Sequence, residues 1–124
     1  MAILNMEEEK LEHIMNLTPT PLKMMREGKK TIELRLYDEK RKLICVGDTI
    51  KFINTQNSAD ILRVCVEDLY IFDSFNELYE NLPLTECGYT ENDVDTASPS
   101  DMERYYSKEQ QSRYGVVGIK ISVI

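Results

Sequence analysis

The sequence has few of the residues that build metal and redox sites. It contains one histidine, His13, and three cysteines, none of which form a CxxC pair. A structural zinc site needs about four nitrogen or sulfur ligands, and a disulfide framework needs closely spaced, paired cysteines. We therefore expect no zinc, no other metal site and no disulfide framework. Cys45 and Cys65 each lie between two aliphatic residues and are expected to pack in the core.

Long apolar runs and glycine-rich loops are also missing. No stretch approaches the roughly 20 apolar residues of a membrane helix. The first residues contain the acidic run Glu7-Glu8-Glu9 instead of the basic and apolar parts of a signal peptide. None of the five glycines belongs to a P-loop or a dinucleotide fingerprint, and no HExxH motif occurs. These absences predict a cytoplasmic protein with no membrane partner and no cofactor.

Positive charge is scarce overall but locally concentrated. The formal net charge is -7, which opposes binding of nucleic acid because phosphate contacts rely on Lys and Arg. Between Lys23 and Lys51, however, nine basic residues stand against five acidic ones. This asymmetry is typical of one basic surface on an acidic body, and a solvated charged face without a partner produces the same pattern.

The remaining sequence predicts one α+β domain. A chain of 124 residues with 42% hydrophobic residues is long enough for a single core. Alternating apolar residues predict strands. Gly28 predicts the end of the first helix, and capping boxes predict three short helix starts: Ser74 with Glu77, Ser100 with Glu103, and Ser107 with Gln110. The predicted strands begin near 14 and span 31–36, 49–53, 61–71 and 117–123; the predicted helices span 20–27, 74–80 and 101–113, the last whole or broken near Ser107. A small antiparallel sheet of this kind avoids open edges by full or partial barrel closure. We expect residues 1–12 to form an N-terminal extension or frayed helix, with the domain over 13–124.

The strand at 31–36 is the clearest candidate for a binding surface. Its residues Ile32, Leu34 and Leu36 alternate with Thr31, Glu33 and Arg35, which predicts one buried face and one free polar face.

The order of several segments resembles the ASCH domain family. They are GKKTIELRL at 28–36, GDTIKF at 47–52, SFNELY at 74–79, MERYYS at 102–107 and YGVVGI at 114–119. The resemblance implies a PUA-like small β-barrel with short peripheral helices, and RNA as the partner. It also implies that a Lys-Thr-x-Glu-x-Arg strand lines a cleft; here that strand supplies Lys30, Thr31, Glu33 and Arg35.

These residues have chemistry that suits a nucleotide ligand. Arg35 offers a planar fork for phosphate or a base edge, and Lys30 offers a compact cation. Glu33 is expected to accept hydrogen bonds, or to act as a general base if burial raises its pKa. We add Arg41 and Tyr106 to the ligand-binding set. Tyr106 is a candidate for base stacking, although its helical spacing from Met102 is equally typical of a core residue.

The first hypothesis is a binding module whose cleft holds an RNA element or a modified nucleoside or nucleotide. Other functions remain open. Some small ASCH proteins are amidohydrolases acting on N4-acetylcytidine with a Lys, a Thr three residues later and a distant Glu. Lys30 matches that lysine, but Glu33 occupies the Thr position, and either Glu67 or Glu77 would have to serve as the distant acid. A ribonuclease using Lys30, Glu33 and Arg35 is a second enzymatic alternative. A protein that binds partners through its acidic surface is a third, and His13 is either structural or cleft-lining.

Overall fold

The structure, a computed structural model, describes residues 9–124, so most of the extension expected over residues 1–12 lies outside the described residues. Five strands form one sheet: β1 (Glu12–Leu17), β2 (Ile32–Leu36), β3 (Thr49–Asn54), β4 (Asn57–Phe72) and β5 (Val116–Val123). Three α-helices accompany them: α1 (Pro19–Arg26), α2 (Phe75–Asn81) and α3 (Lys108–Tyr114). Four 3₁₀ helices complete the fold: η1 (Arg41–Leu43), η2 (Leu84–Glu86), η3 (Val94–Thr96) and η4 (Pro99–Arg104).

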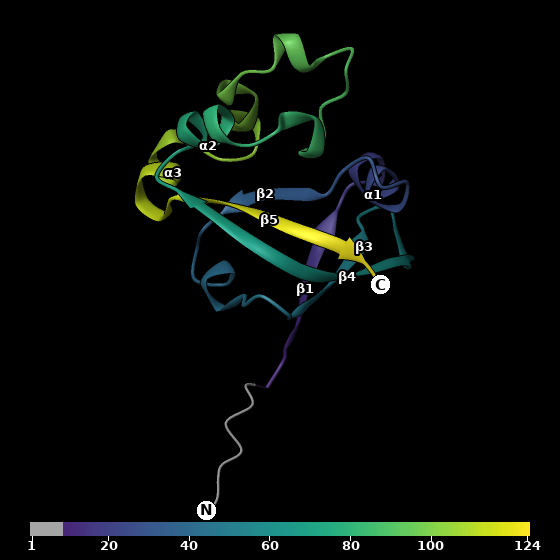
Figure 1. The fold of residues 1–124 in the computed structure, drawn as a ribbon. Coiled ribbons are helices and arrows are strands. Elements are labelled where there is room, and N and C mark those ends of the chain that lie inside the picture. Colours follow the sequence, from purple (N-terminus) through teal and green to yellow (C-terminus); the bar gives the residue numbers. More distant parts are fainter. Residues whose placement is uncertain (1–8) are drawn as a thin grey trace, which may run out of the picture.

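The sheet curls into a half-barrel in the order β1-β3-β4-β5-β2 (Figure 1). The expected α+β class with short peripheral helices is confirmed. The sheet is mixed, however, because β1 pairs with β3 in parallel while the other pairs are antiparallel. Closure is partial: β1 and β2 are the two edges, and neither has a second strand partner among residues 9–124. The free edge of β2 faces the segment between α2 and α3, which rises above the sheet (Figure 1).

Two hydrophobic clusters hold the fold together. The larger lies inside the curl and includes Phe52, Val64 and Ile119, none of which is exposed. The smaller lies between the sheet and the helical segment, around Phe75 and Leu78. The long strand β4 contributes side chains to both clusters. Its register shifts between Val66 and Asp68, and such a bulge redirects the side chains that follow it.

Both faces of β2 are covered, which corrects the expectation of a free polar face. Ile32, Leu34 and Leu36 pack in the smaller cluster, as predicted. Glu33 lies opposite Ile119 of β5 and therefore points toward the inside of the curl, where only 3% of it is exposed. Alternation identified the apolar face of this strand but not what covers the polar one.

The ends of the helices follow their cap residues. Helix α1 starts after Thr18 with Pro19 in its first turn, one residue before the predicted range of 20–27. Gly28 follows the helix with a φ of +74°, as predicted for a residue that ends a helix. Ser74 accepts a hydrogen bond from the Glu77 N–H, which confirms the predicted cap of α2.

The region 98–114 forms two short helices, and one predicted cap there is wrong. Ser107 and Gln110 form the predicted capping box of α3. The preceding helix is capped by Ser98 with Asp101, not by Ser100 with Glu103. A serine before a proline at the first helical position was the local signal for that start.

The expectation for the cysteines is also corrected. Cys45 is exposed and Cys65 is partly exposed, whereas Cys87 is the buried one. Within residues 9–124, no helix is both long and apolar enough to cross a membrane.

Candidate functional site

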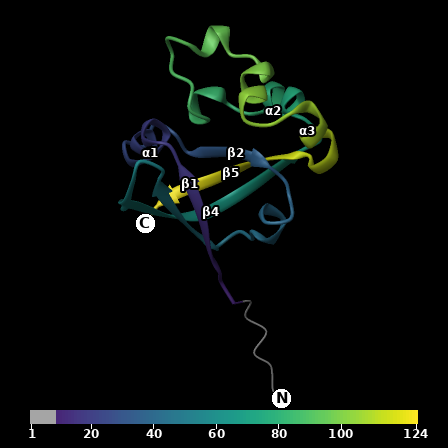
Figure 2. The same cartoon turned by 180° about the vertical axis from the view of Figure 1, so that it is seen from behind.

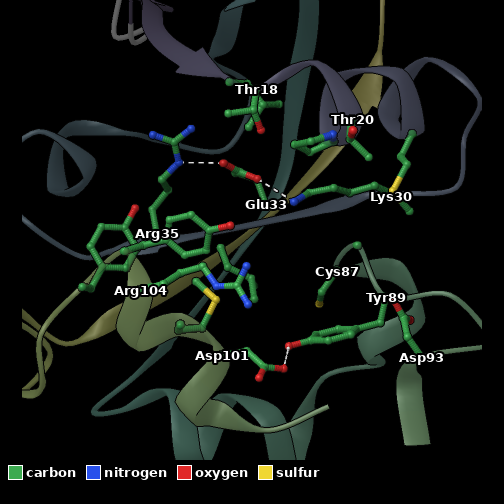
Figure 3. Close-up of a pocket in the computed structure, with 18 of the residues that line it drawn as sticks. Thr18, Thr20, Lys30, Glu33, Arg35, Cys87, Tyr89, Asp93, Asp101 and Arg104 are labelled. Carbon is green, nitrogen blue, oxygen red and sulfur yellow. Dashed lines mark hydrogen bonds and ion pairs between the residues drawn. The ribbon is translucent and has the colours of Figure 1, made fainter. Parts of the chain in front are cut away.

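A pocket of about 610 Å³ lies along the free edge of β2. Its upper wall in Figure 3 comes from the end of β1, from α1 and from β2, and its lower wall comes from the segment 87–106. Figure 2 shows from behind that α1 lies at one end of β2 and that this segment lies above the strand. Its lining includes Asn16, Thr18, Lys30, Glu33, Leu34, Arg35, Cys87, Tyr89, Asp93, Asp101, Arg104, Tyr105 and Tyr106.

A buried ion triad forms the upper wall. Lys30 Nζ lies 2.9 Å from Glu33 Oε1, and Arg35 Nε donates to Glu33 Oε2 at 2.6 Å (Figure 3). The side chains of Lys30 and Arg35 are only 9% and 13% exposed. Both carboxylate oxygens are therefore occupied, and Glu33 positions two cations at the pocket wall.

Glu33 is ionised in the folded protein. Burial raises the pKa of a carboxyl group, but the adjacent Lys30 and Arg35 outweigh it and hold the pKa of Glu33 at about 2. The hypothesis that burial raises the pKa of Glu33 is therefore wrong. A carboxylate with so low a pKa is a weak general base at neutral pH.

Arg35 also joins the two edges of the half-barrel. Its Nη2 donates to the backbone carbonyl of Asn16 in β1 at 2.8 Å, while the residue itself belongs to β2. Across residues 9–124, the third nitrogen, Nη1, has no hydrogen-bond acceptor. One guanidinium nitrogen thus links β2 to β1, a second binds Glu33 of the same strand, and the third is left for a ligand.

The edge of β2 adds backbone groups to the pocket. The Ile121 N–H donates to the Thr31 carbonyl, which makes Glu33 and Ile119 a hydrogen-bonded pair of the antiparallel ladder. The N–H and C=O of Leu34 consequently point away from β5, toward the free edge that lines the pocket. One donor and one acceptor are presented side by side there.

The lower wall carries phenols and carboxylates. The Tyr89 hydroxyl donates to Asp101 Oδ2 at 2.7 Å, and the Tyr79 and Tyr89 hydroxyls are also 2.7 Å apart (Figure 3). Burial and these hydrogen bonds raise the pKa of Tyr89, so its proton stays on the phenol. The bonds from Tyr89 and from the Ser98 N–H lower the pKa of Asp101, which keeps it ionised.

The structure brings four of the six predicted ligand-binding residues to the pocket: Lys30, Glu33, Arg35 and Tyr106. One ring face of Tyr106 is stacked on Phe75 of the smaller cluster, with the centroids 6.1 Å apart. Tyr106 is thus partly a core residue.

Thr31 and Arg41 do not line this pocket. Thr31 Oγ1 donates to Glu86, which also pairs with Lys120 at 2.7 Å. Arg41, the first residue of η1, pairs with Asp38 at 3.3 Å. Thr31 has the same parity as Glu33, but it lies one residue before β2 begins and its hydroxyl is directed to Glu86.

The other candidate residues have structural partners elsewhere. His13 contacts Asp48 at 2.8 Å, and Glu67 accepts a hydrogen bond from Ser122; neither His13, Glu67 nor Glu77 lines the pocket. Cys87 does line it, but burial raises the pKa of its thiol to about 12, which makes it a poor nucleophile.

No sequence pattern predicted the lower wall. Tyr89, Asp101 and Arg104 come from turns and 3₁₀ helices, which show no sustained periodicity. The Ser98-Pro99 start of η4 was the one usable signal, since it fixes Asp101 as the cap partner.

Comparisons with known proteins agree with this architecture. The sequence model of the ASCH domain family matches residues 15–124. The crystal structure of the hypothetical protein PH0355 is 32% identical, with a TM-score of 0.72, and the match covers 94% of this chain and 100% of that one. The solution NMR structure of protein PF0455 from Pyrococcus furiosus is 33% identical, with a TM-score of 0.67 and coverage of 91% and 97%. No curated protein matches the chain.

A more distant structure shows the same fold. The crystal structure of the ASCH domain from Lactobacillus crispatus is 13% identical, with a TM-score of 0.60, and covers 92% of this chain and 79% of that one. The family model spans most of the chain, and the half-barrel with short helices accords with it. This protein belongs to the ASCH domain family.

Proposed function

We propose that the chain binds RNA or a nucleotide, with one nucleotide unit held in the pocket along β2. The observation that carries the proposal is the set of hydrogen-bond donors that the fold places there and leaves open. Arg35 Nη1 has no acceptor, and Lys30 Nζ contacts a single carboxylate oxygen among the described residues. Donors held in place by a buried ion triad are suited to a phosphate or a base edge.

The size and lining of the pocket support a nucleotide. Its volume of about 610 Å³ falls within the range typical of small-ligand sites. The rings of Tyr89, Tyr105 and Tyr106 line it, and Tyr105 is 64% exposed, which leaves its ring available for stacking on a base. The free backbone N–H and C=O of Leu34 add a donor and an acceptor for a base edge.

The enzymatic alternatives lack support from the geometry. With a pKa of about 2, Glu33 is too weak a base to remove a proton efficiently at neutral pH. Neither candidate for the distant acid of an amidohydrolase, Glu67 or Glu77, lines the pocket. Binding without turnover is the function that these contacts favour.

Arg104 provides the sharpest test of where the ligand binds. It is exposed, lies over the Tyr105 ring at 5.8 Å and points into the pocket in Figure 3, and no carboxylate within residues 9–124 forms an ion pair with it. Arg104→Ala is expected to weaken binding of a short single-stranded RNA about tenfold with little change in stability. In a plot of the logarithm of affinity against the logarithm of salt concentration, the slope should also become shallower. The change should match the loss of about one phosphate contact.

Arg113 offers a matched control. It is also an exposed arginine over a tyrosine, with the guanidinium 5.3 Å from the Tyr114 ring, but it lies on α3 and does not line the pocket. Arg113→Ala should change the affinity less than about twofold. Equal losses in both variants, measured by fluorescence anisotropy at several salt concentrations, would show that RNA is attracted by general charge and not bound in the pocket.

A further inference from the structure

The two walls of the pocket are chemically opposite. Three cationic side chains line it, from Lys30, Arg35 and Arg104, and three carboxylates line it as well, from Glu33, Asp93 and Asp101. Only the Glu33 carboxylate is neutralised inside the pocket, because both of its oxygens contact the cations. Net positive charge therefore faces the ligand from β2, and net negative charge faces it from the segment 87–106.

Asp101 has a free acceptor atom. Its Oδ2 accepts from the Tyr89 hydroxyl at 2.7 Å and from the Ser98 N–H at 3.1 Å. Its Oδ1 has no donor in the part of the chain that the structure describes. Because the Tyr89 proton is directed to Asp101, the Tyr89 oxygen is left to accept from Tyr79. The linked groups Tyr79, Tyr89 and Asp101 therefore offer the ligand a hydrogen-bond acceptor at Asp101, and the Tyr89 proton is not available to it.

The lower wall is mixed: Arg104 attracts an anion, but Asp93 and Asp101 repel one, so a ligand with only anionic groups does not satisfy both walls. A ligand that fits has a phosphate or a carbonyl at one end and a hydrogen-bond donor at the other. Among nucleotides, cytosine and adenine carry an exocyclic amino group at the position where uracil and hypoxanthine carry a carbonyl oxygen. A carboxylate accepts a hydrogen bond from the amino group and repels the carbonyl oxygen.

We propose that the pocket selects a nucleotide whose base carries an exocyclic amino group, with Asp101 Oδ1 as the acceptor for that amine. This inference rests on the proposed function and names its ligand class. It assigns a specificity role to a residue that also caps η4, so the same hydrogen bonds that fix the 3₁₀ helix orient the free oxygen.

The test compares two pairs of mononucleotides that differ at this group. Isothermal titration of the full chain with CMP against UMP, and with AMP against IMP, is expected to show about tenfold tighter binding of the amino-bearing member of each pair. The same titration with short oligocytidylate and oligouridylate shows whether the ligand is a free nucleotide or a nucleotide unit within RNA. A preference seen only with the oligomers assigns the site to RNA.

The Asp101→Asn variant tests whether Asp101 is the residue that causes the preference for an amino-bearing base. The amide oxygen can still accept from Tyr89 and Ser98, while its NH₂ group now faces the base and donates to a carbonyl. The preference should fall to parity or reverse toward UMP and IMP. Asp95→Asn is the matched control, since Asp95 is an exposed carboxylate of the same segment that does not line the pocket, and it should keep the wild-type preference.

Each outcome decides something. Equal binding of CMP and UMP by the wild type overturns the inference and leaves the proposed function standing. A preference that persists in a folded Asp101→Asn variant, as checked by its melting temperature, also overturns it. Failure of every nucleotide and oligomer to bind refutes the proposed function and, with it, this inference. The wild-type comparison remains decisive even if Asp101→Asn does not fold.

Discussion

Glu33→Gln is expected to lower the free energy of unfolding at pH 7 by roughly 3 kcal/mol, which corresponds to a melting temperature lower by about 10 °C. The substitution keeps the size of the side chain and removes its charge, so Lys30 and Arg35 remain buried without their shared counterion. Folding shifts the pKa of Glu33 from 4.5 to about 2, and this shift gives the same order of magnitude.

The loss should depend on pH in a defined direction. Because the pKa of Glu33 is lower in the folded state, its contribution to stability is fully present above about pH 4.5 and is lost as the pH falls toward 2. Glutamine resembles the protonated acid, so the two proteins should converge in stability as the pH approaches 2. Urea unfolding at pH 7, 5, 4 and 3, followed by circular dichroism, measures this convergence.

Glu12→Gln is the control for this prediction. Glu12 pairs with Arg63 at 3.0 Å on the surface, where the two side chains are 40% and 53% exposed. An exposed pair contributes about 1 kcal/mol or less, so this variant should unfold close to the wild type. If Glu33→Gln lost no more unfolding free energy at pH 7 than Glu12→Gln, this would contradict the burial of the ion triad that the geometry indicates.

Arg35→Ala is expected to have the second large effect, because it removes a ligand contact and a structural one together. The variant leaves Glu33 with a single cation and breaks the hydrogen bond that joins β2 to the Asn16 carbonyl of β1. Removing one partner of a buried ion pair costs about 3–5 kcal/mol, so both unfolding free energy and RNA binding should fall. A free polar face, as the alternation at 31–36 predicts, would instead leave the melting temperature of this variant nearly unchanged.

A double-mutant cycle separates the two roles of Arg35. In a Glu33→Gln background the ion pair is already gone, so Arg35→Ala should cost at least about 1 kcal/mol less than in the wild type. Arg63→Ala, which breaks only the exposed pair with Glu12, is the matched arginine control. Additive costs at positions 33 and 35 would contradict the coupling that the triad requires.

The sequence predicted those parts of the fold that depend on neighbours along the chain. Alternation located β2, β3, β4 and β5, and the cap residues Ser74 and Ser107 located the starts of α2 and α3. The parallel pairing of β1 with β3 was missed, because it depends on contacts between residues far apart in the sequence. Local periodicity carries no information about which strands become neighbours.

The site was predicted only on its upper wall, for a similar reason. Lys30, Glu33 and Arg35 were identified from the family resemblance and the charge pattern of one strand. Their burial was not, because it results from β1 and the segment 87–106 covering the edge of β2. Asp101 and Arg104 came from a segment without periodicity, and only the folded chain brings them opposite Arg35 (Figure 3).

The most direct test of the proposed function is an NMR titration of the isotope-labelled protein with CMP and with a short single-stranded RNA. We expect saturable shift changes in the backbone amides of residues 30–35 and 87–106 and in the side-chain Nε–H signals of Arg35 and Arg104. Helix α3, which carries the control Arg113, should remain unchanged. Shift changes confined to α3 and η1, or no saturable change with either ligand, would contradict the assignment of this pocket as the nucleotide-binding site.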